Sequence, residues 1–499
     1  MTGLVVCAPL RVEARALRRG LGGHGRVVRT GYGPQRSAAA SALLARLDPD
    51  SVAVGGVAGG LVGDLSAGDL VVASQVTGVG PDVACPSAPL LAGELRRSGL
   101  RTRVGSITTV DTLVRRGGHA ALAASGAIAA DLESGPLLSC LPDRPSVVVR
   151  AISDHAGRPL VSPHTVTGGL AALRSLRLAG PALARWAAAA GARQLLLAGP
   201  RSFCAGVERA IEIVELALKR YGAPVYVRKQ IVHNARVVTE LEQLGAVFVD
   251  ELDEVPDGGT VVFSAHGVSP AVRRAAARRG LVTVDATCPL VSKVHAEARR
   301  FAGDGYLVVL IGHAGHDEVE GTLGEAPSST VLVQTPDDVA KLAPADPSRV
   351  AYLTQTTLSA ADADQVVTAI KERFPDARDP GSDDICYAST NRQLAVRAVA
   401  RQSDLVLVAG SANSSNSRRL VETAEREGTR AHLVDGPEDI QLGWLTGAPA
   451  IGITAGASAP PAVVEEIIAA LSGLGPVQTR EVVVTTESVQ FGLPRELRH

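Results

Sequence analysis

The sequence predicts an α/β protein built from two domains. Its 499 residues are too many for a single hydrophobic core. Runs of β-branched residues alternate with Ala-, Arg- and Glu-rich segments of helical pattern, which is typical of βαβ units and mostly parallel sheets. The helical pattern PALARWAAAAGA ends near Gly191, and QLLLAGP then begins a new buried strand. We therefore expect one domain over residues 1–190 and a second over residues 194–499.

The composition is that of an ordinary globular protein and excludes several classes of partner. The formal net charge is −1, with 46% hydrophobic and 20% charged residues, so no basic excess points to nucleic acid. The N-terminal stretch MTGLVVCAPLRVEARAL favours a first strand over a signal peptide, because its apolar run is short and follows no basic residue. SVAVGGVAGGLVG is too short and too Gly-rich to span a bilayer. We expect a cytoplasmic protein without a membrane span, in which the six cysteines stay reduced.

The first half carries its acidic residues at the ends of predicted elements. LVVCAPLRVEARAL predicts a strand and then a helix with Glu13, and VVRTGYGPQRSAAASALL predicts a strand, a glycine turn and a helix. SVAVGGVAGGLVGDLSAGDLVVAS predicts two strands around a Gly-rich turn, in which GGVAGG weakly indicates a phosphate loop. AIAADLESGPLL places Asp131 and Glu133 before a helical run, and the buried strand SVVVRAISDHAG ends at Asp154. Taken singly, Glu13 fits a helix-face charge and Asp154 a cap or turn residue.

Together and in this order, these segments resemble the purine nucleoside phosphorylase and methylthioadenosine/adenosylhomocysteine nucleosidase family over about residues 3–175, and its hopanoid-associated phosphorylase-like branch. The resemblance implies a purine nucleoside ligand. Asp154 would protonate the purine at N7, Glu133 would hold the ribose hydroxyls, and Glu13 would position the attacking water. These groups suit the oxocarbenium-like state of purine loss. Base-stacking aromatic residues are hard to find in the sequence. Phosphate as the nucleophile, and a non-catalytic binding or dimerisation module, stay open as alternatives.

In the second half, polar side chains follow the apolar runs that predict strands. These runs are LLLAGP, PVYVRKQIV, TVVFSA, LVTVDAT, YLVVLIG, VAYLTQ, DLVLVAGSAN and AIGITAGA. Ligands bind at the carboxyl ends of strands in open parallel sheets, so the pattern predicts a ligand site. The residues concerned are Cys204, His233, His266, Cys288, His316, Glu318, Thr356, Ser414, Ser415, Asn416 and Ser458.

Three cysteines of the second half predict a metal centre. Cys204, Cys288 and Cys386 follow one another at near-even intervals of 84 and 98 residues, which suggests three similar α/β lobes that each bring one thiolate from a strand end. Three thiolates without a nearby fourth suit an iron–sulfur cluster with one iron left open to substrate. One isolated cysteine would more often be a small buried hydrophobe. A zinc-dependent hydrolase stays an alternative, although structural zinc sites have close ligand pairs that are absent here.

The remaining strand-end residues predict an anion site. His, Thr, Ser and Asn side chains donate hydrogen bonds to a diphosphate, and the helix N-termini behind them favour its charge. SSNS at residues 414–417 opens the helical pattern SRRLVETAERE, so these residues are equally natural N-caps. Glu318, close to His316, is placed to deliver a proton, whereas alone it would be an ordinary surface glutamate.

The second half resembles the 4-hydroxy-3-methylbut-2-enyl diphosphate reductase (LytB/IspH) family over about residues 194–497. The resemblance rests on the motifs RSFCAGVERAI, VRKQIVHN, FSAHGVS, DATCPLVSKVH, IGHAGHDEVEGT, LTQTTLS, DDICYASTNRQ, GSANSSNS, TAGASAP and FGLPRELR. It implies a trefoil of three α/β lobes around a [4Fe–4S] cluster. It also implies reductive dehydroxylation of the allylic diphosphate to isopentenyl and dimethylallyl diphosphates, the last step of the methylerythritol phosphate isoprenoid pathway.

By motif position, the same resemblance implies a role for each residue. Cys204, Cys288 and Cys386 would be the cluster ligands. Thr356 would lie beside the substrate hydroxyl, and Glu318 would be the proton source. The diphosphate pocket would be lined by His233, His266, His316, Ser414, Ser415, Asn416 and Ser458. This half shows no flavin or nicotinamide fingerprint, so we expect ferredoxin or flavodoxin as an external electron donor.

Overall fold

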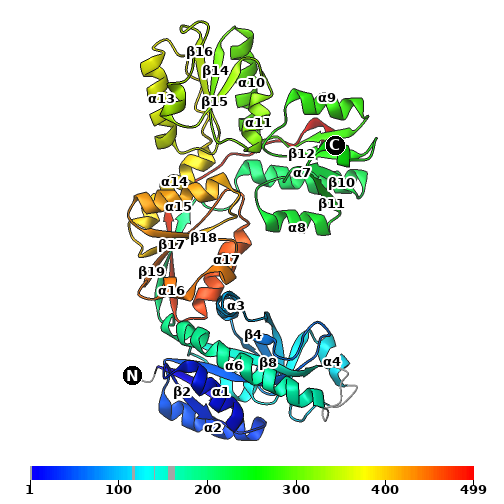
Figure 1. The fold of residues 1–499 in the computed structure, drawn as a ribbon, viewed down its shortest axis with the longest axis vertical. Helices are drawn as coiled ribbons and strands as arrows, with labels where there is room; N and C mark the ends of the chain where they lie inside the picture. Colours follow the sequence, from blue (N-terminus) through cyan, green and yellow to red (C-terminus); the bar gives the residue numbers. More distant parts are fainter. Residues whose placement is uncertain (1–2, 115–117, 140, 156–162, 499) are drawn as a thin grey trace. The chain divides into compact units, whose positions relative to one another are not determined.

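The computed structural model describes residues 3–114, 118–139, 141–155 and 163–498 (Figure 1). The chain divides into two compact units. The first unit comprises residues 1–195, 436–451 and 465–480, and the second comprises residues 196–435, 452–464 and 481–499. Within the described ranges, none of the helices combines the length and apolarity that crossing a membrane requires.

The first unit is built on a mixed sheet. The strands are β1 (Leu4–Ala8), β2 (Arg26–Arg29), β3 (Ser51–Gly60), β4 (Leu70–Gly78), β5 (Val83–Ala84), β6 (Thr102–Thr109), β7 (Ala127–Asp131) and β8 (Ser146–His155). Their order is β2-β1-β3-β7-β6-β4-β5, and β8 pairs with both β3 and β4. β3 is parallel to β1 and β8 but antiparallel to β7. Residues Val54, Ile107 and Val148 fill the core of this sheet.

Within the described part of residues 1–195, six helices accompany this sheet. They are α1 (Arg11–Leu21), α2 (Pro34–Leu47), α3 (Ala88–Arg97), α4 (Gly118–Ala124), α5 (Ser134–Leu138) and α6 (Pro163–Ala188). α1 packs on α6 through glycine, since a Cβ atom on Gly20 would overlap the Arg177 carbonyl. α6 also packs on β8, so these helices cover the sheet beside the strand that carries Asp154.

The GGVAGG sequence lies inside strand β3 and not in a turn. The indication of a phosphate loop was therefore wrong, and the connection between β3 and β4 is formed by residues 61–69. A Cβ atom on Gly56 would overlap Arg150 Nη1 and lie 3.1 Å from Glu13 Oε1. The glycine in the strand therefore leaves room for buried charged side chains.

The second unit contains three α/β lobes, which confirms the predicted fold class (Figure 1). The first lobe has the sheet β11-β10-β12-β13 and the second has β15-β14-β16, and all of these neighbouring strands are parallel. The third lobe has the sheet β18-β17-β19-β9-β20. Each lobe has its own apolar core, represented by Val227 in the first, Val309 in the second and Val406 in the third.

The elements of the lobes follow in chain order. Those of the first lobe are α7 (Ala205–Tyr221), β10 (Val225–Arg228), α8 (Ala235–Gln243), β11 (Ala246–Val249), η1 (Leu252–Glu254), β12 (Thr260–Phe263), α9 (Pro270–Arg278) and β13 (Val282–Asp285). Those of the second are α10 (Pro289–Gly303), β14 (Leu307–Ile311), α11 (Asp317–Leu323), β15 (Thr330–Val333), α12 (Pro336–Val339), β16 (Val350–Thr354) and α13 (Ala360–Arg373). Those of the third are β9 (Arg193–Gly199), α14 (Tyr387–Ala400), β17 (Leu405–Ala409), α15 (Ser415–Arg426), β18 (Arg430–Val434), β19 (Ala450–Ala455) and β20 (Val477–Val483). The elements η2 (Pro437–Asp439) and α16 (Leu442–Leu445) and most of α17 (Pro461–Ser472) belong to the first unit. The last element, η3 (Arg495–Leu497), adds Leu497 to the core of the first lobe.

Each of the three cysteines stands at the N-terminus of a helix. Cys204 is the N-cap of α7, Cys288 of α10 and Cys386 of α14. Cys204 and Cys288 come after strands β9 and β13, as expected from the apolar runs. Cys386 differs from the expectation, because an irregular segment after the isolated bridge at Arg378 leads into it. What the three positions share is the helix N-terminus, where the dipole favours a thiolate.

Candidate active sites

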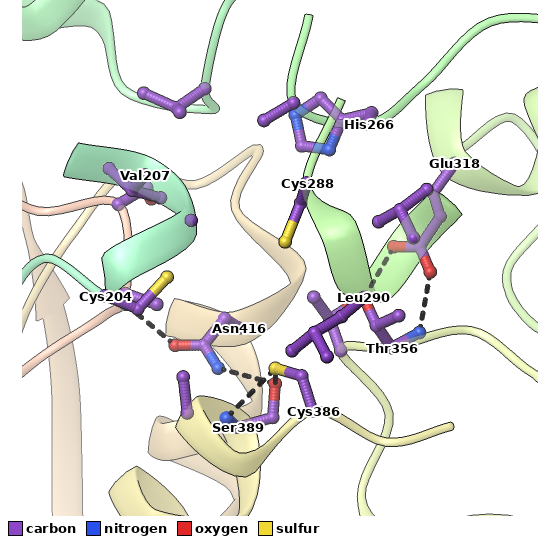
Figure 2. A pocket seen from close by; sticks show the side chains of 18 of the residues that line it. Cys204, Val207, His266, Cys288, Leu290, Glu318, Thr356, Cys386, Ser389 and Asn416 are labelled. Carbon is purple, nitrogen blue, oxygen red and sulfur yellow. Dashed lines mark hydrogen bonds between the residues drawn. The ribbon is translucent and has the colours of Figure 1, made fainter. Parts of the chain in front are cut away.

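A pocket in the second unit brings together all the residues of the predicted reductase site (Figure 2). The lobes contribute helix N-termini and loops to its lining. The predicted residues that line it are Cys204, His233, His266, Cys288, His316, Glu318, Thr356, Cys386, Ser414, Ser415, Asn416 and Ser458.

The three thiols point toward one shared space (Figure 2). A Cβ atom on Gly206 would lie 2.9 Å from Cys288 Sγ and 3.8 Å from Cys204 Sγ, so the glycine leaves this space open. Burial raises the pKa of Cys288 to about 12 and that of Cys386 to about 11. A bare thiolate is therefore unfavourable here, whereas a bound metal cation would compensate its charge.

Glu318 and Thr356 form a buried hydrogen-bonded pair. The Thr356 backbone N–H donates to Glu318 Oε1 at 2.7 Å, and the Thr356 hydroxyl donates to Oε2 at 2.9 Å (Figure 2). Glu318 is 2% exposed, and this burial raises its pKa to about 7 although both hydrogen bonds oppose the shift. A carboxyl group with this pKa can hold and release a proton at neutral pH.

Three imidazoles lie together in the same pocket. The rings of His233 and His266 are stacked, with centroids 4.1 Å apart and an interplanar angle of 20°, and His316 is edge-on to both. Burial lowers the pKa of each ring, to about 3 for His316. One nitrogen from each of the three rings lies within 4.8 Å of the other two. An imidazole binds a metal along its own ring plane, so two nearly parallel planes cannot aim at one ion. They can, however, reach separate oxygens of a diphosphate.

The hydroxyl and amide groups of the pocket are partly committed to the fold. Ser414 caps α15 by accepting the Ser417 N–H at 3.3 Å, so the capping role that the sequence offered as an alternative is present. The Ser458 hydroxyl donates to the His233 carbonyl at 3.1 Å. The Asn416 Oδ1 atom accepts the Ala457 N–H at 3.0 Å, and its amide donates to the Ser389 hydroxyl at 3.3 Å (Figure 2). These contacts fix the orientation of the pocket wall.

A second pocket lies in the first unit and collects Glu13, Glu133 and Asp154. The Glu13 carboxylate, 1% exposed, accepts the backbone N–H groups of Val57 at 2.8 Å and Leu10 at 2.7 Å. Burial nevertheless raises the pKa of Glu13 and that of Glu133. The three carboxyl groups that the first resemblance selected are therefore brought to one cavity.

Arg150 is a residue of this site that sequence reasoning missed. It is fully buried, and its guanidinium pairs with Asp131 at 2.8 Å and with Glu133 at 3.3 Å. The signal was available, since a lone arginine inside the apolar run SVVVRAIS must find carboxylates if that strand is buried. Tyr32 also lines the pocket and provides an aromatic ring that was not recognised from the sequence.

Comparison with known proteins agrees with these observations. Residues 195–472 match the family described as LytB protein. 4-Hydroxy-3-methylbut-2-enyl diphosphate reductase 2 of Mycobacterium bovis is 59% identical over 314 residues, which cover 62% of this chain and 95% of that protein. The reductase of Leifsonia xyli is 56% identical over 309 residues, covering 62% and 92% of the two chains. The solved structure of the Plasmodium falciparum reductase matches with a TM-score of 0.59 and 38% identity, covering 62% and 97%.

The chain belongs to the LytB family. This LytB protein carries an additional N-terminal part, of which residues 15–179 match the phosphorylase superfamily. That range includes Glu133 and Asp154, whereas Glu13 lies just before it. The LytB resemblance is thus confirmed, and the first resemblance is confirmed at the level of the phosphorylase superfamily.

The LytB family uses an iron–sulfur cluster, and the residues of this chain fit such a group. Soft thiolates are the ligands that iron–sulfur clusters require, and the three cysteines of the pocket face one space that Gly206 keeps free. The backbone N–H of Ser389 donates to Cys386 Sγ at 3.3 Å, and the Ser389 hydroxyl oxygen lies 3.2 Å from the same sulfur, so this thiol has hydrogen-bond partners in the pocket. Sequence reasoning did not identify Ser389.

Proposed function

We propose that residues 194–499 reduce 4-hydroxy-3-methylbut-2-enyl diphosphate, and that residues 1–190 form a separate functional domain. The reaction consumes two electrons and two protons, breaks the allylic C–O bond, and yields isopentenyl or dimethylallyl diphosphate and water. The observation that supports this best is that three thiols, a buried acid and a set of anion-binding side chains line one pocket. The match to named reductases supports the same substrate.

Cys204, Cys288 and Cys386 would hold the cluster, as a [4Fe–4S] group with one iron not bound by a side chain. When bound, this group supplies single electrons and a Lewis-acidic iron beside the substrate hydroxyl. The protein itself excludes water and holds the substrate in place, which is proximity catalysis. Glu318 gives a proton to the leaving oxygen, and the Thr356 hydroxyl that donates to Glu318 keeps the carboxyl group in position.

The diphosphate would be bound opposite the cysteines by side chains from separate loops and helix N-termini. Stacked His233 and His266 donate to separate oxygens, and His316 approaches from the edge. Ser414, Ser415, Asn416 and Ser458 add hydroxyl and amide donors. α15 contributes the favourable end of its dipole.

The decisive assay uses the full chain after anaerobic reconstitution with iron and sulfide. Reduced ferredoxin, reduced flavodoxin and a chemical reductant are supplied in parallel, and isopentenyl and dimethylallyl diphosphates are quantified. Turnover with a protein donor is expected. Turnover with the chemical reductant but with neither ferredoxin nor flavodoxin would contradict the proposed donors. No product under any condition would contradict the function. Zinc without a brown chromophore would favour the zinc-dependent hydrolase.

We expect diphosphate binding to take up protons. Burial lowers the pKa of His233, His266 and His316, so the rings of the free pocket are neutral at pH 7. A bound diphosphate raises those pKa values, since an adjacent negative charge favours imidazolium. Affinity should therefore fall as pH rises from 6 to 8, by up to about tenfold per unit of pH for each proton taken up. Calorimetric titration in two buffers of different ionisation enthalpy measures the uptake, and identical heats would contradict it.

A second candidate function belongs to the first unit: cleavage of the glycosidic bond of a purine nucleoside. It is supported by the convergence of Glu13, Glu133 and Asp154 in one pocket. Asp154 would protonate the purine at N7, Glu133 would hold the ribose hydroxyls, and Glu13 would position water. The rival proposal is a non-catalytic binding or dimerisation module.

Asp154→Asn is expected to reduce purine release by about 10²- to 10⁴-fold, the usual contribution of a general acid. The full chain is incubated with methylthioadenosine, adenosylhomocysteine and inosine, with and without phosphate, and free base is measured. Asp64→Asn is the matched control, because Asp64 is an exposed partner of Arg103. No release by the unmodified chain would favour the binding module, and release that requires phosphate would contradict water as the nucleophile.

A further inference from the structure

Arg392 joins two of the three cysteine segments. It lies in α14 and is fully buried. Its guanidinium donates to the Ser202 carbonyl at 2.7 and 3.0 Å and to the Phe203 carbonyl at 3.0 Å. These carbonyls directly precede Cys204, and Cys386 caps the helix from which Arg392 projects. One side chain thus fixes the spacing between the two cysteine segments.

Arg209 does the same for the remaining cysteine. It lies in α7, which begins after Cys204, and is 9% exposed. Its Nη1 donates to the carbonyls of Ala286 at 3.3 Å and Thr287 at 3.1 Å, the two residues before Cys288. The backbone positions of all three cysteine segments are therefore connected through two buried guanidinium groups.

The segment 484–498, which we name the C-terminal strap, contacts both arginines. Glu487 accepts from Arg392 Nη1 at 3.0 Å, and the Gly492 carbonyl accepts from Arg209 Nε at 2.8 Å. Between these contacts, Phe491 lines the same pocket as the cysteines. The match to the LytB family described above ends at residue 472, but the strap contains FGLPRELR, which also resembles that family.

The strap has little regular structure to hold it in place. Residues 485–494 form no strand or helix, and its end is anchored by Leu497, 4% exposed in the core of the first lobe. The Glu487 side chain is only 16% exposed, and its carboxylate is the charge that pairs with Arg392. A buried guanidinium without its carboxylate is strongly destabilised. Loss of Glu487 should therefore move Arg392 toward water and release the carbonyls before Cys204.

We propose that the C-terminal strap is a positioning element for the iron–sulfur centre, in which Glu487 holds Arg392 in place and Phe491 shields the thiols from solvent. The proposal rests on the proposed reductase function. It predicts that the strap controls how long the cluster is retained. Diphosphate affinity should change little, because the strap is joined by hydrogen bonds to Arg209, Asn391 and Arg392, and the diphosphate side chains lie on other segments.

The test uses the full chain with Glu487→Gln, which keeps the shape of the side chain and removes its charge. After anaerobic reconstitution, iron and sulfide per chain are measured, and the cluster absorbance is followed in air and with an iron chelator. We expect loss at least about threefold faster than in the unmodified chain, since a buried charge loses its partner. Glu487→Asp, which retains the charge, should recover most of the lifetime.

Glu481→Gln is the matched control. Glu481 also pairs with an arginine, Arg201, but is 50% exposed, and surface pairs contribute little. Its cluster lifetime should equal that of the unmodified chain. Equal lifetimes for Glu487→Gln and the unmodified chain would overturn the proposal. If Glu487→Gln does not fold, the same cluster decay is measured in Phe491→Ala, provided that its melting temperature is unchanged. Faster decay would support the proposal, and equal decay would overturn it. Absence of a cluster from the unmodified chain would instead contradict the reductase function.

Discussion

Replacing Cys288 with serine is expected to abolish both cluster binding and reductase turnover. The bare thiol is already difficult to ionise, because burial raises its pKa to about 12, and a serine hydroxyl is harder still to deprotonate. Oxygen is also a harder ligand than the thiolate that iron–sulfur clusters prefer. We expect iron content to fall sharply and turnover to fall by more than about a hundredfold, since even changes outside the ligand shell cost 10- to 100-fold.

Iron, sulfide and absorbance of the reconstituted variant measure the first effect, and product formation measures the second. Cys85→Ala is the control, because Cys85 is a buried thiol in the core of the first unit, away from the reductase pocket. That variant should bind the cluster normally. Full cluster content in Cys288→Ser would refute the ligand assignment, whereas loss in Cys85→Ala would point to a general folding effect.

Replacing Glu318 with glutamine is expected to lower kcat by about 10²- to 10⁴-fold, the range for removal of a general acid. Glutamine has nearly the same shape and can still contact Thr356, so substrate affinity should change little. The buried carboxyl has a pKa raised to about 7, so the proton is present below pH 7 and is lost as pH rises through that value. The kcat of the unmodified chain should therefore decline above pH 7.

Steady-state kinetics from pH 5.5 to 9 measures both the loss of kcat in Glu318→Gln and the decline of kcat of the unmodified chain above pH 7. Glu320→Gln is the matched control, since Glu320 is an exposed carboxylate in the same helix α11. Its kinetic constants should match those of the unmodified chain. If the kcat of Glu318→Gln stays within a factor of two of that of the unmodified chain, another group supplies the proton. The same follows if kcat depends on pH in the same way in both proteins.

The sequence predicted the residues of the reductase pocket well because their signal is local. Each of Cys204, His233, His266 and Cys288 comes directly or within a few residues after an apolar run, and parallel strands place such residues on one edge. Cys386 was the exception, since an irregular segment leads into it, and its interval from Cys288 and the motif around it marked it instead of an apolar run. The position that all three cysteines share, a helix N-terminus, became clear in the structure.

Other features depend on contacts between distant residues and could not be predicted. The apolar run around Arg150 indicates that this arginine needs carboxylate partners, but no spacing in the chain identifies them as Asp131 and Glu133. Arg392 and Glu487 are separated by 95 residues, so their pairing is equally invisible in a local pattern. The glycines of GGVAGG predicted a turn, because clustered glycines are typical of turns. Their role in strand β3, which is to make room for a distant side chain, has no signal in the local sequence.

The sequence by itself determined the chemistry that is available: thiols for iron–sulfur, imidazoles and hydroxyls for a diphosphate, and carboxyl groups for proton transfer. It also determined the α/β fold class, because alternation of strand and helix patterns is encoded within short windows. Only the tertiary structure decided which side chains meet and in which protonation state. The reason is that desolvation and ion pairing depend on everything that packs around a group. The same carboxyl side chain is buried with a pKa raised to about 7 at Glu318 and is an exposed surface group at Glu320.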